Sequence, residues 1–467
     1  MPLKFVFGPS GSGKSTYLYQ HVIEESEKYP LKNFIVLVPE QFTMQTQKDL
    51  VSMHPRHGIM NIDVLSFARL AYRVFEETGT KQMQVLDDEG KNLILRKIAG
   101  DYENKLTVLK GNIKKLGYIS EVKSVISEFT QYDIGEEEID EMLDHLDEDS
   151  RLYYKLKDIR LLYEGFQDYL RERYITKEEL LDVLNSQVKE SELLKNSVVV
   201  LDGFTGFTPV QNRLILELMR CCKEVWVTVT MDERENPYAY KHPYQLFGLS
   251  KQMITTLVRM AGEDHIEVEE PVCLYGYPVK RFEKNQELAF LERNIFRYGS
   301  GRYDKAVENL EIHAAGNPRQ EADAVAEGIR RLVRKEQYRY RDIGVIVSDM
   351  NVYGDYLEQA FENYGIPVFM DHKRSILLNS FVEYIRSLLN MAEKNFSYES
   401  VFRFLRTNLA GFACEEVDEL ENYVLGLGIR GYKGWQNRWI RRSRGMEEEE
   451  LDRLNHYRVQ LVEKVDN

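Results

Sequence analysis

The chain has 467 residues, and its 62 Lys and Arg residues against 76 Asp and Glu residues give a formal charge of −14. This balance excludes a generally basic nucleic-acid coat, and 43% hydrophobic with 30% charged residues is typical of a globular protein of about two to four domains. No stretch approaches the roughly 18 apolar residues of a membrane span, and no secretory signal is present. We therefore expect no membrane association and a cytoplasmic location.

The N-terminal part of the chain alternates strand and helix signals. Phe5–Phe7 and Phe34–Val38 are short apolar runs typical of buried strands, and Lys14–Lys28 between them has helical spacing. From Asp87 to Leu194 apolar residues recur at intervals of three and four and strand signals vanish. The pattern predicts a βαβ opening followed by a helical insertion.

Two further strand signals, at Ser197–Leu201 and Val225–Thr230, follow the predicted insertion. They indicate that one parallel sheet is interrupted by the insertion and then resumed. We therefore assign 1–84 and 195–300 to one domain and 85–194 to the insertion.

A second alternating unit begins near Leu310. Its predicted elements are strand Glu311–Ala314, helix Gln320–Lys335, strand Ile343–Ser348, helix Tyr353–Asn363 and strand Pro367–Met370. We assign 301–395 to the start of a second parallel-sheet domain, and 396–467 to the start of a further helical insertion. The predicted fold class is α/β, with two parallel-sheet domains and helical insertions.

Neither the cysteines nor the basic stretches settle a function. The four cysteines, which are Cys221, Cys222, Cys273 and Cys414, show no C-x-x-C pair and no histidine at ligand spacing, so we expect no zinc or iron–sulfur site in this segment. Arg330–Arg341 and Lys433–Arg444 are basic and rich in aromatic residues, a composition that suits nucleic acid but more often marks a solvated face.

Residues 8–15, GPSGSGKS, fit the phosphate-loop pattern G-x-x-x-x-G-K-S/T between a predicted strand and a predicted helix. In such a loop the backbone N–H groups surround the phosphates, Lys14 neutralises the β and γ oxygens, and the Ser15 hydroxyl binds Mg²⁺. We therefore predict a site for ATP with Mg²⁺. Its nucleotide-binding residues are Gly8, Pro9, Ser10, Gly11, Ser12, Gly13, Lys14 and Ser15.

A second part of this site is expected where the strand Ser197–Leu201 ends. Asp202 has the place of a Mg²⁺ ligand, so Ser15 and Asp202 are the predicted metal ligands. The alternative is a turn residue in an Asp-Gly pair. Hydrolysis also needs a carboxylate that orients water, usually in the next position, where this chain has Gly203. We predict nucleotide binding and assign no catalytic residue.

The order of these motifs resembles superfamily 1 helicases of the UvrD type, in which the later strand ends in D-E-x-Q-D-x-x-P-x-Q. Residues 202–211, DGFTGFTPVQ, keep the Asp, the Pro and the last Gln. Residues 64–73, VLSFARLAYR, are similar to an intervening helicase motif, and 364–369, YGIPVF, resemble the motif IV region of the second domain. The usual arginine near Ser348 or Asp349 is absent. The resemblance implies two RecA-like domains.

Together with residues 38–43, VPEQFT, this combination is similar to the AddB family, the degenerate helicase-like subunits of bacterial AddAB helicase–nucleases. The resemblance implies the motor subunit AddA as a heterodimer partner and the processing of double-strand DNA ends for recombination. Family members are much longer, so we expect an N-terminal fragment. The family's nuclease, with its Mg²⁺ and 4Fe-4S cluster, lies toward the C-terminus and is not expected in it.

In that family the helicase-like part reads the Chi sequence on single-stranded DNA. The positions that match its DNA-contacting motifs are Gln41, Thr43, Phe67, Arg69, Tyr72, Phe204 and Phe207. Amides, hydroxyls and arginines read base edges, and aromatic rings stack on unpaired bases. Phe67 or Tyr72 could instead be a core residue, and Arg69 could be a solvated charge.

Two other functions remain open. One is an active phosphate-loop enzyme: a stand-alone helicase would need a carboxylate at position 203, where the chain has Gly203, and arginines from the second domain. A small-molecule kinase would be compact, with substrate-binding arginines near the loop, whereas this chain has a large helical insertion between its motifs. An interaction scaffold with a vestigial loop would differ from the main hypothesis in not binding single-stranded DNA. The resemblance does not extend to the upstream glutamine motif with which UvrD-type helicases hold adenine. We therefore expect nucleotide binding to be weak, and to serve a structural role rather than to drive a motor.

Overall fold

The computed structural model describes residues 2–79, 84–112, 115, 117–171, 174–297, 299, 301–371 and 376–466. They group into two compact units, Met1–Glu311 and Ile312–Asn467. Within the described residues, no helix is both long enough and apolar enough to cross a lipid bilayer.

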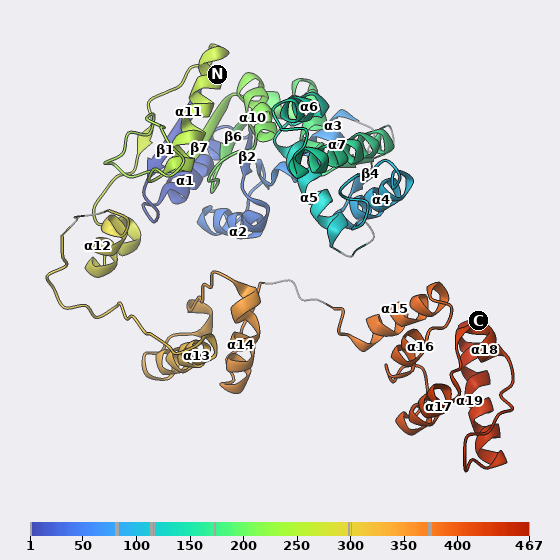
Figure 1. The fold of residues 1–467 in the computed structure, drawn as a ribbon. Coiled ribbons are helices and arrows are strands. Elements are labelled where there is room, and N and C mark those ends of the chain that lie inside the picture. Colours follow the sequence, from blue (N-terminus) through green and yellow to red (C-terminus); the bar gives the residue numbers. More distant parts are fainter. Residues whose placement is uncertain are drawn as a thin grey trace. The chain divides into compact units, whose positions relative to one another are not determined.

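The first unit contains a six-stranded sheet in the order β3-β2-β6-β7-β1-β8 (Figure 1). Its strands are β1 Leu3–Gly8, β2 Asn33–Leu37, β3 Ile62–Leu65, β6 Ser197–Leu201, β7 Glu224–Thr230 and β8 Val272–Cys273. All the strand pairs are parallel. Because β6 lies between β2 and β7, the predicted resumption of the sheet after the insertion is confirmed. The architecture is α/β and consistent with a RecA-like domain.

Helices cover both faces of this sheet (Figure 1). They are α1 Lys14–Lys28, α2 Thr43–Met53, α3 Phe67–Thr78, α10 Pro209–Cys221 and α11 Gly248–Glu263, whereas none of the described residues of α12 Gln286–Asn294 contributes to the cores of the sheet. Phe5 and Phe7 of β1 pack into one apolar core with α3, α10 and α11, whereas Val6 packs into another with α1 and α2. Because successive strand residues point to opposite faces, a continuous apolar run serves both cores.

The region between the two pieces of the sheet is mainly helical. It contains β4 Gln84–Leu86, α4 Asp88–Asp101, α5 Tyr118–Gln131, α6 Glu136–Asp144, α7 Arg151–Leu170, β5 Tyr174–Thr176, α8 Leu180–Gln187, the 3₁₀ turn Val188–Glu190 and α9 Glu192–Lys195. The prediction that strands vanish here is wrong in one detail, because β5 pairs in parallel with β4. Three residues in each strand are too few for a period-two pattern to show in the sequence.

The second unit has helices α13 Pro318–Lys335, α14 Met350–Asn363, α15 Ser380–Glu393, α16 Tyr398–Leu405, α17 Cys414–Leu427, α18 Gly431–Gln436 and α19 Glu448–Asp466. The two helices predicted between 320 and 363 are confirmed. The three predicted strands, at 311–314, 343–348 and 367–370, are wrong, because none of these segments forms a strand. A strand needs a neighbour for its ladder of hydrogen bonds, and no such ladder joins these described segments.

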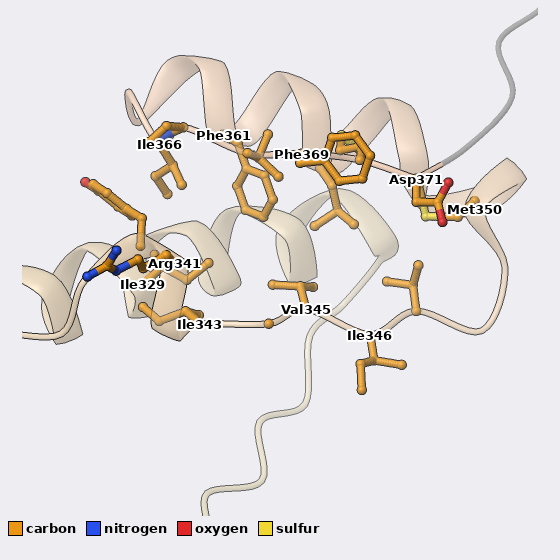
Figure 2. Close-up of a pocket in the computed structure, with 17 residues that line it drawn as sticks. Ile329, Arg341, Ile343, Val345, Ile346, Met350, Phe361, Ile366, Phe369 and Asp371 are labelled. Carbon is orange, nitrogen blue, oxygen red and sulfur yellow. The ribbon is translucent and has the colours of Figure 1, made fainter. Parts of the chain in front are cut away.

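Two of these segments line an apolar cavity of about 920 Å³. Figure 2 shows Ile343 and Val345 on one side and Phe361 and Phe369 on the other. Several of its apolar side chains face solvent, and Phe369 is 89% exposed. The sequence pattern of a buried strand is therefore present in segments that pair with no strand among the described residues.

Candidate functional site

The phosphate loop connects β1 to α1 and surrounds the amino end of that helix. Gly11 and Gly13 have φ angles of +83° and +94°, which glycine adopts without strain. Gly13 is the N-cap of α1, so the backbone N–H groups gather at the positive end of the helix dipole. The buried hydroxyl of Ser12 has no hydrogen-bond partner among the described residues. Residues 8–15 thus form a cradle suited to an anion.

Lys14 holds its ammonium group against this loop. Its Nζ donates to the carbonyl oxygens of Gly8 and Pro9, both at 2.9 Å. Burial lowers the pKa of Lys14 to about 8; the charge of Asp202 opposes this shift and that of Arg281 adds to it. A bound polyphosphate would favour the protonated amine, so binding and protonation of Lys14 are linked.

Asp202 lies directly after β6, and its carboxylate accepts three hydroxyl hydrogen bonds. Ser15 Oγ donates to Oδ1 at 3.1 Å, and Thr228 Oγ1 donates to the same oxygen at 2.6 Å. Tyr19 OH donates to Oδ2 at 2.7 Å. Asp202 is only 5% exposed, so these donors replace the water that burial removes. Burial and the charge of Asp202 raise the pKa of Tyr19, so this phenol remains a donor.

The residues around this carboxylate fit ATP with Mg²⁺. Ser15 Oγ and Asp202 Oδ1 lie beside each other, and hydroxyl and carboxylate oxygens are ligands that Mg²⁺ prefers. The Ser12 hydroxyl has no partner among the described residues, so it is available to a phosphate oxygen. The left-handed backbone at Gly11 and Gly13 lets the N–H groups of the loop face the same oxygens. The structure therefore brings the two predicted metal ligands together next to the predicted phosphate-binding residues.

Gly203 occupies the position where a water-orienting carboxylate was sought. Its φ is +79°, in the left-handed region that side-chain-bearing residues rarely adopt. Its N–H donates to Thr228 Oγ1 at 3.4 Å. Position 203 therefore has no side chain, and its backbone conformation favours glycine over any residue that could supply a carboxylate.

Sequence reasoning missed two cations that lie over the loop. They belong to the 3₁₀ turn Lys280–Phe282, in which the Arg281 N–H donates to Gly11 O at 3.0 Å. A Cβ on Gly11 would come within 2.8 Å of Arg281 Cβ, and a Cβ on Gly13 within 3.4 Å of Lys280 Cδ. Among the described residues, no ion pair is recorded for either cation. The only sequence signal was the adjacent pair Lys280 and Arg281 itself, which lies far from the loop in the chain.

The predicted DNA-contacting residues lie at the same, carboxyl, edge of the sheet. Gln41 is exposed in the 3₁₀ turn Glu40–Phe42 after β2. Thr43 is buried at the start of α2, and its hydroxyl donates to Glu40 O at 3.0 Å. Phe42, which the sequence analysis did not select, is 47% exposed between them. The exposed groups of this turn are thus the carboxylate of Glu40, an amide and an aromatic ring.

Phe67, Phe204 and Phe207 form one aromatic cluster. Their ring centroids lie 5.4 Å apart for Phe67 and Phe204, 6.4 Å for Phe67 and Phe207, and 5.2 Å for Phe204 and Phe207. Phe67 is 7% exposed and packs in the core below the sheet edge. On the same helix, α3, Arg69 and Tyr72 are exposed. The cluster supports the edge, and the two exposed side chains could contact a ligand.

The acidic, histidine and cysteine side chains offer no second metal centre within the described part of the chain. Among the residues that the structure describes, no three His, Cys, Asp or Glu side chains come together as a metal-binding group. All four cysteines are free thiols.

Comparison with known proteins gives one consistent family. A family model described as ADDB, N-terminal, matches residues 5–292. The chain is 44% identical to the ATP-dependent helicase/deoxyribonuclease B-subunit of Lachnoclostridium phytofermentans, over 99% of this chain and 41% of that protein. It is 36% identical to the proteins of the same name from Caldanaerobacter subterraneus subsp. tengcongensis, over 97% and 39%, and Clostridium kluyveri, over 92% and 37%. The chain thus spans about two fifths of these relatives' length.

Nucleotide binding should take up a proton near the pKa of Lys14. Below about pH 6.5 the amine is already protonated, so binding takes up none, whereas above about pH 8 binding must restore the proton and the affinity falls. Titration calorimetry with MgADP in buffers of different ionisation enthalpy measures this uptake. Lys14→Arg should abolish the proton uptake, because an arginine side chain does not titrate in this pH range. Equal proton uptake at about pH 6.5 and at about pH 8 would contradict the assignment to Lys14.

Arg281→Ala should weaken MgADP binding about ten-fold, because a charge-assisted contact with phosphate is lost. The matched control is Arg259→Ala, which removes an exposed arginine that pairs with Glu263 on α11. Fluorescence titration of a labelled nucleotide gives both affinities. An unchanged affinity in Arg281→Ala would show that this cation only packs against Gly11.

Proposed function

This chain belongs to the AddB N-terminal family, and from that membership we propose that it forms the helicase-like part of the AddB-type subunit in an AddAB-type helicase–nuclease. The observation that carries the proposal is a phosphate site in which Ser15 and Asp202 are paired while position 203 is a left-handed glycine. The proposal includes AddA as the motor partner and double-strand DNA ends, processed for recombinational repair, as the substrate of the whole protein.

In this proposal the first unit binds ATP without hydrolysing it. Lys14 and the backbone of the loop hold the phosphates, and Arg281 adds positive charge from its turn over Gly11. Ser15 and Asp202 would hold Mg²⁺, which supplies charge neutralisation for the phosphates when bound. Gly203 cannot orient a water molecule. A bound nucleotide then stabilises the folded unit by mass action rather than driving translocation along DNA.

The carboxyl edge of the sheet is proposed to bind single-stranded DNA and, in the whole protein, to take part in Chi recognition. Arg69 can contact a phosphate or a base edge, Gln41 a base edge, and the rings of Tyr72 and Phe42 can stack on unpaired bases. The supporting observation is that these four side chains are exposed at or beside the edge that also carries the phosphate site. The cluster around Phe67 holds this edge in place.

With 396–467 as the start of a helical insertion, residues 301–395 are proposed to be the start of a second RecA-like domain. Its segments 343–348 and 367–370 have the composition of buried parallel strands and flank the apolar cavity in Figure 2. The relatives are more than twice as long as the matched chain, so they have further polypeptide that could supply the neighbouring strands. The nuclease, with its Mg²⁺ and 4Fe-4S cluster, is proposed to lie in that further polypeptide.

One observation favours the alternative of an active ATPase. Glu292 on α12 lies close enough to Lys14 for their charges to interact, and burial, followed by the charge of Asp232, raises its pKa. A carboxylate with a raised pKa beside a phosphate loop has the property of a general base. The ATPase measurement below separates the two functions.

The chain should bind ATP but show no turnover above a Lys14→Ala control, with or without single-stranded DNA, because no group at position 203 positions water. Steady-state phosphate release measures this, and Glu292→Gln should leave the result unchanged. DNA-stimulated turnover that is lost in both Lys14→Ala and Glu292→Gln would establish the ATPase alternative instead.

Arg69→Ala and Tyr72→Ala should each weaken single-stranded DNA binding about five- to ten-fold, the first by loss of an electrostatic contact and the second by loss of base stacking. Loss of a phosphate contact in Arg69→Ala should reduce the log–log salt slope by about 0.7, whereas loss of stacking in Tyr72→Ala should leave it unchanged. Tyr29→Ala, an exposed tyrosine before the amino end of β2, is the control for fluorescence anisotropy. If all three variants bound single-stranded DNA as tightly as the wild-type chain, the proposal that this edge binds DNA would be wrong.

Backbone amides of 343–347 should exchange quickly in this chain and be protected at least about ten-fold in a full-length relative, since ladder hydrogen bonds slow exchange. Hydrogen exchange with mass spectrometry compares the two proteins. The helix α13 should exchange at similar rates in both. Rapid exchange of 343–347 in the full-length protein would show that this segment never joins a sheet.

A further inference from the structure

One tyrosine links the phosphate site to α2, the helix that follows the proposed DNA-binding turn. Ser15 and Tyr19 are four residues apart on α1, so they lie on one face of the helix. Both hydroxyls donate to Asp202, Ser15 to Oδ1 and Tyr19 to Oδ2. The Tyr19 oxygen also lies 3.3 Å from Thr46 Oγ1 on α2. One phenol thus contacts both a predicted metal ligand and a neighbouring helix.

The direction of these hydrogen bonds follows from the number of protons. A phenol has one proton, and a buried carboxylate can only accept, so Tyr19 gives its proton to Asp202. Thr46 must then donate to the Tyr19 oxygen. Tyr19 and Thr46 are 6% and 5% exposed, so water does not compete for either group. The order Thr46 to Tyr19 to Asp202 is therefore fixed.

Thr46 lies one turn into α2, whose first residue is Thr43. The turn just before α2 contains Gln41 and Phe42, two of the exposed side chains at the proposed DNA-binding edge. Apolar contacts also pack α1 and α2 against the same sheet face. Those contacts are non-directional, whereas the hydroxyl link depends on where the Asp202 carboxylate lies.

We propose that Tyr19 is a positioning residue that couples occupancy of the phosphate site to the placement of α2 and of the DNA-binding turn before it. With MgADP bound, Asp202 would share its lone pairs between the Mg²⁺ that it would hold with Ser15 and its hydroxyl donors. Tyr19 moves with Oδ2 and carries Thr46 with it. The inference rests on the proposed function, in that it gives a non-hydrolysing nucleotide an effect on DNA binding.

The same contacts could serve only to fill the space between α1, α2 and β6. A purely structural tyrosine would alter stability but would not make α2 respond to nucleotide. The decisive readout is therefore the response of α2, and DNA is not needed to observe it. This separates the coupling from DNA binding itself.

The experiment is hydrogen exchange over Thr43–Met53 in the chain with and without saturating MgADP. In the wild-type protein, nucleotide should slow exchange of α2 about five-fold or more, in the range of ordinary coupling between sites. Tyr19→Phe keeps the ring and removes the hydroxyl, so the response should fall to less than about two-fold. Thr46→Val should have the same effect by removing the other end of the link. Tyr17→Phe, a tyrosine on the same helix for which no side-chain hydrogen bond to the described residues is recorded, should behave as wild type.

The outcomes are distinguishable. A full nucleotide response in both Tyr19→Phe and Thr46→Val would overturn the coupling, as would a wild-type protein that binds nucleotide and single-stranded DNA without any response of α2. In both cases the proposed function would survive. A wild-type protein that bound no nucleotide would overturn the coupling together with the proposed function. Because Thr46→Val tests the same link from another helix, poor folding of one variant leaves the test intact.

Discussion

The buried carboxylate of Asp202 is the group on which the proposed nucleotide site depends. A charge that is 5% exposed must be compensated, and here three hydroxyl groups compensate it. The donors come from two elements, Ser15 and Tyr19 from α1 and Thr228 from β7. The Asp202 carboxylate therefore constrains all three side chains. Removal of any one hydroxyl leaves the buried carboxylate with one hydrogen-bond donor fewer, in surroundings of low dielectric constant.

The sheet topology makes this convergence possible. In the order β2-β6-β7-β1, the strand that ends in Asp202 is separated by β7 from the strand that ends in the phosphate loop. Thr228 on the intervening β7 donates to Asp202 Oδ1, and Ser15 at the start of α1 donates to the same oxygen. Because the strands are parallel, their carboxyl ends lie at one edge, where loops from distant parts of the sequence meet. A site with this geometry needs the interrupted sheet to reassemble after the helical insertion.

Local features could be predicted from the sequence, and features that depend on a distant partner could not. The helix after Lys14, the phosphate loop and the strand Ser197–Leu201 have short-range signals, and all three are present. The segments 343–348 and 367–370 carry the signal of a strand, but a strand exists only beside a neighbour. Arg281 was missed for the same reason, since nothing near it in sequence shows that it lies over Gly11. The link from Asp202 to Thr46 through Tyr19 likewise joins three separate segments.

The central claim is that this site holds a nucleotide without turning it over. The most direct measurement is the identity of the nucleotide recovered from the ATP-saturated, purified chain after prolonged incubation with Mg²⁺ and single-stranded DNA, beside a Lys14→Ala reference. We predict that the wild-type chain binds ATP, that the nucleotide recovered from its mixture is still ATP, and that the reference binds none. Recovery of ADP from the wild-type chain would contradict the account and show that a catalytic group acts in place of the missing side chain at Gly203.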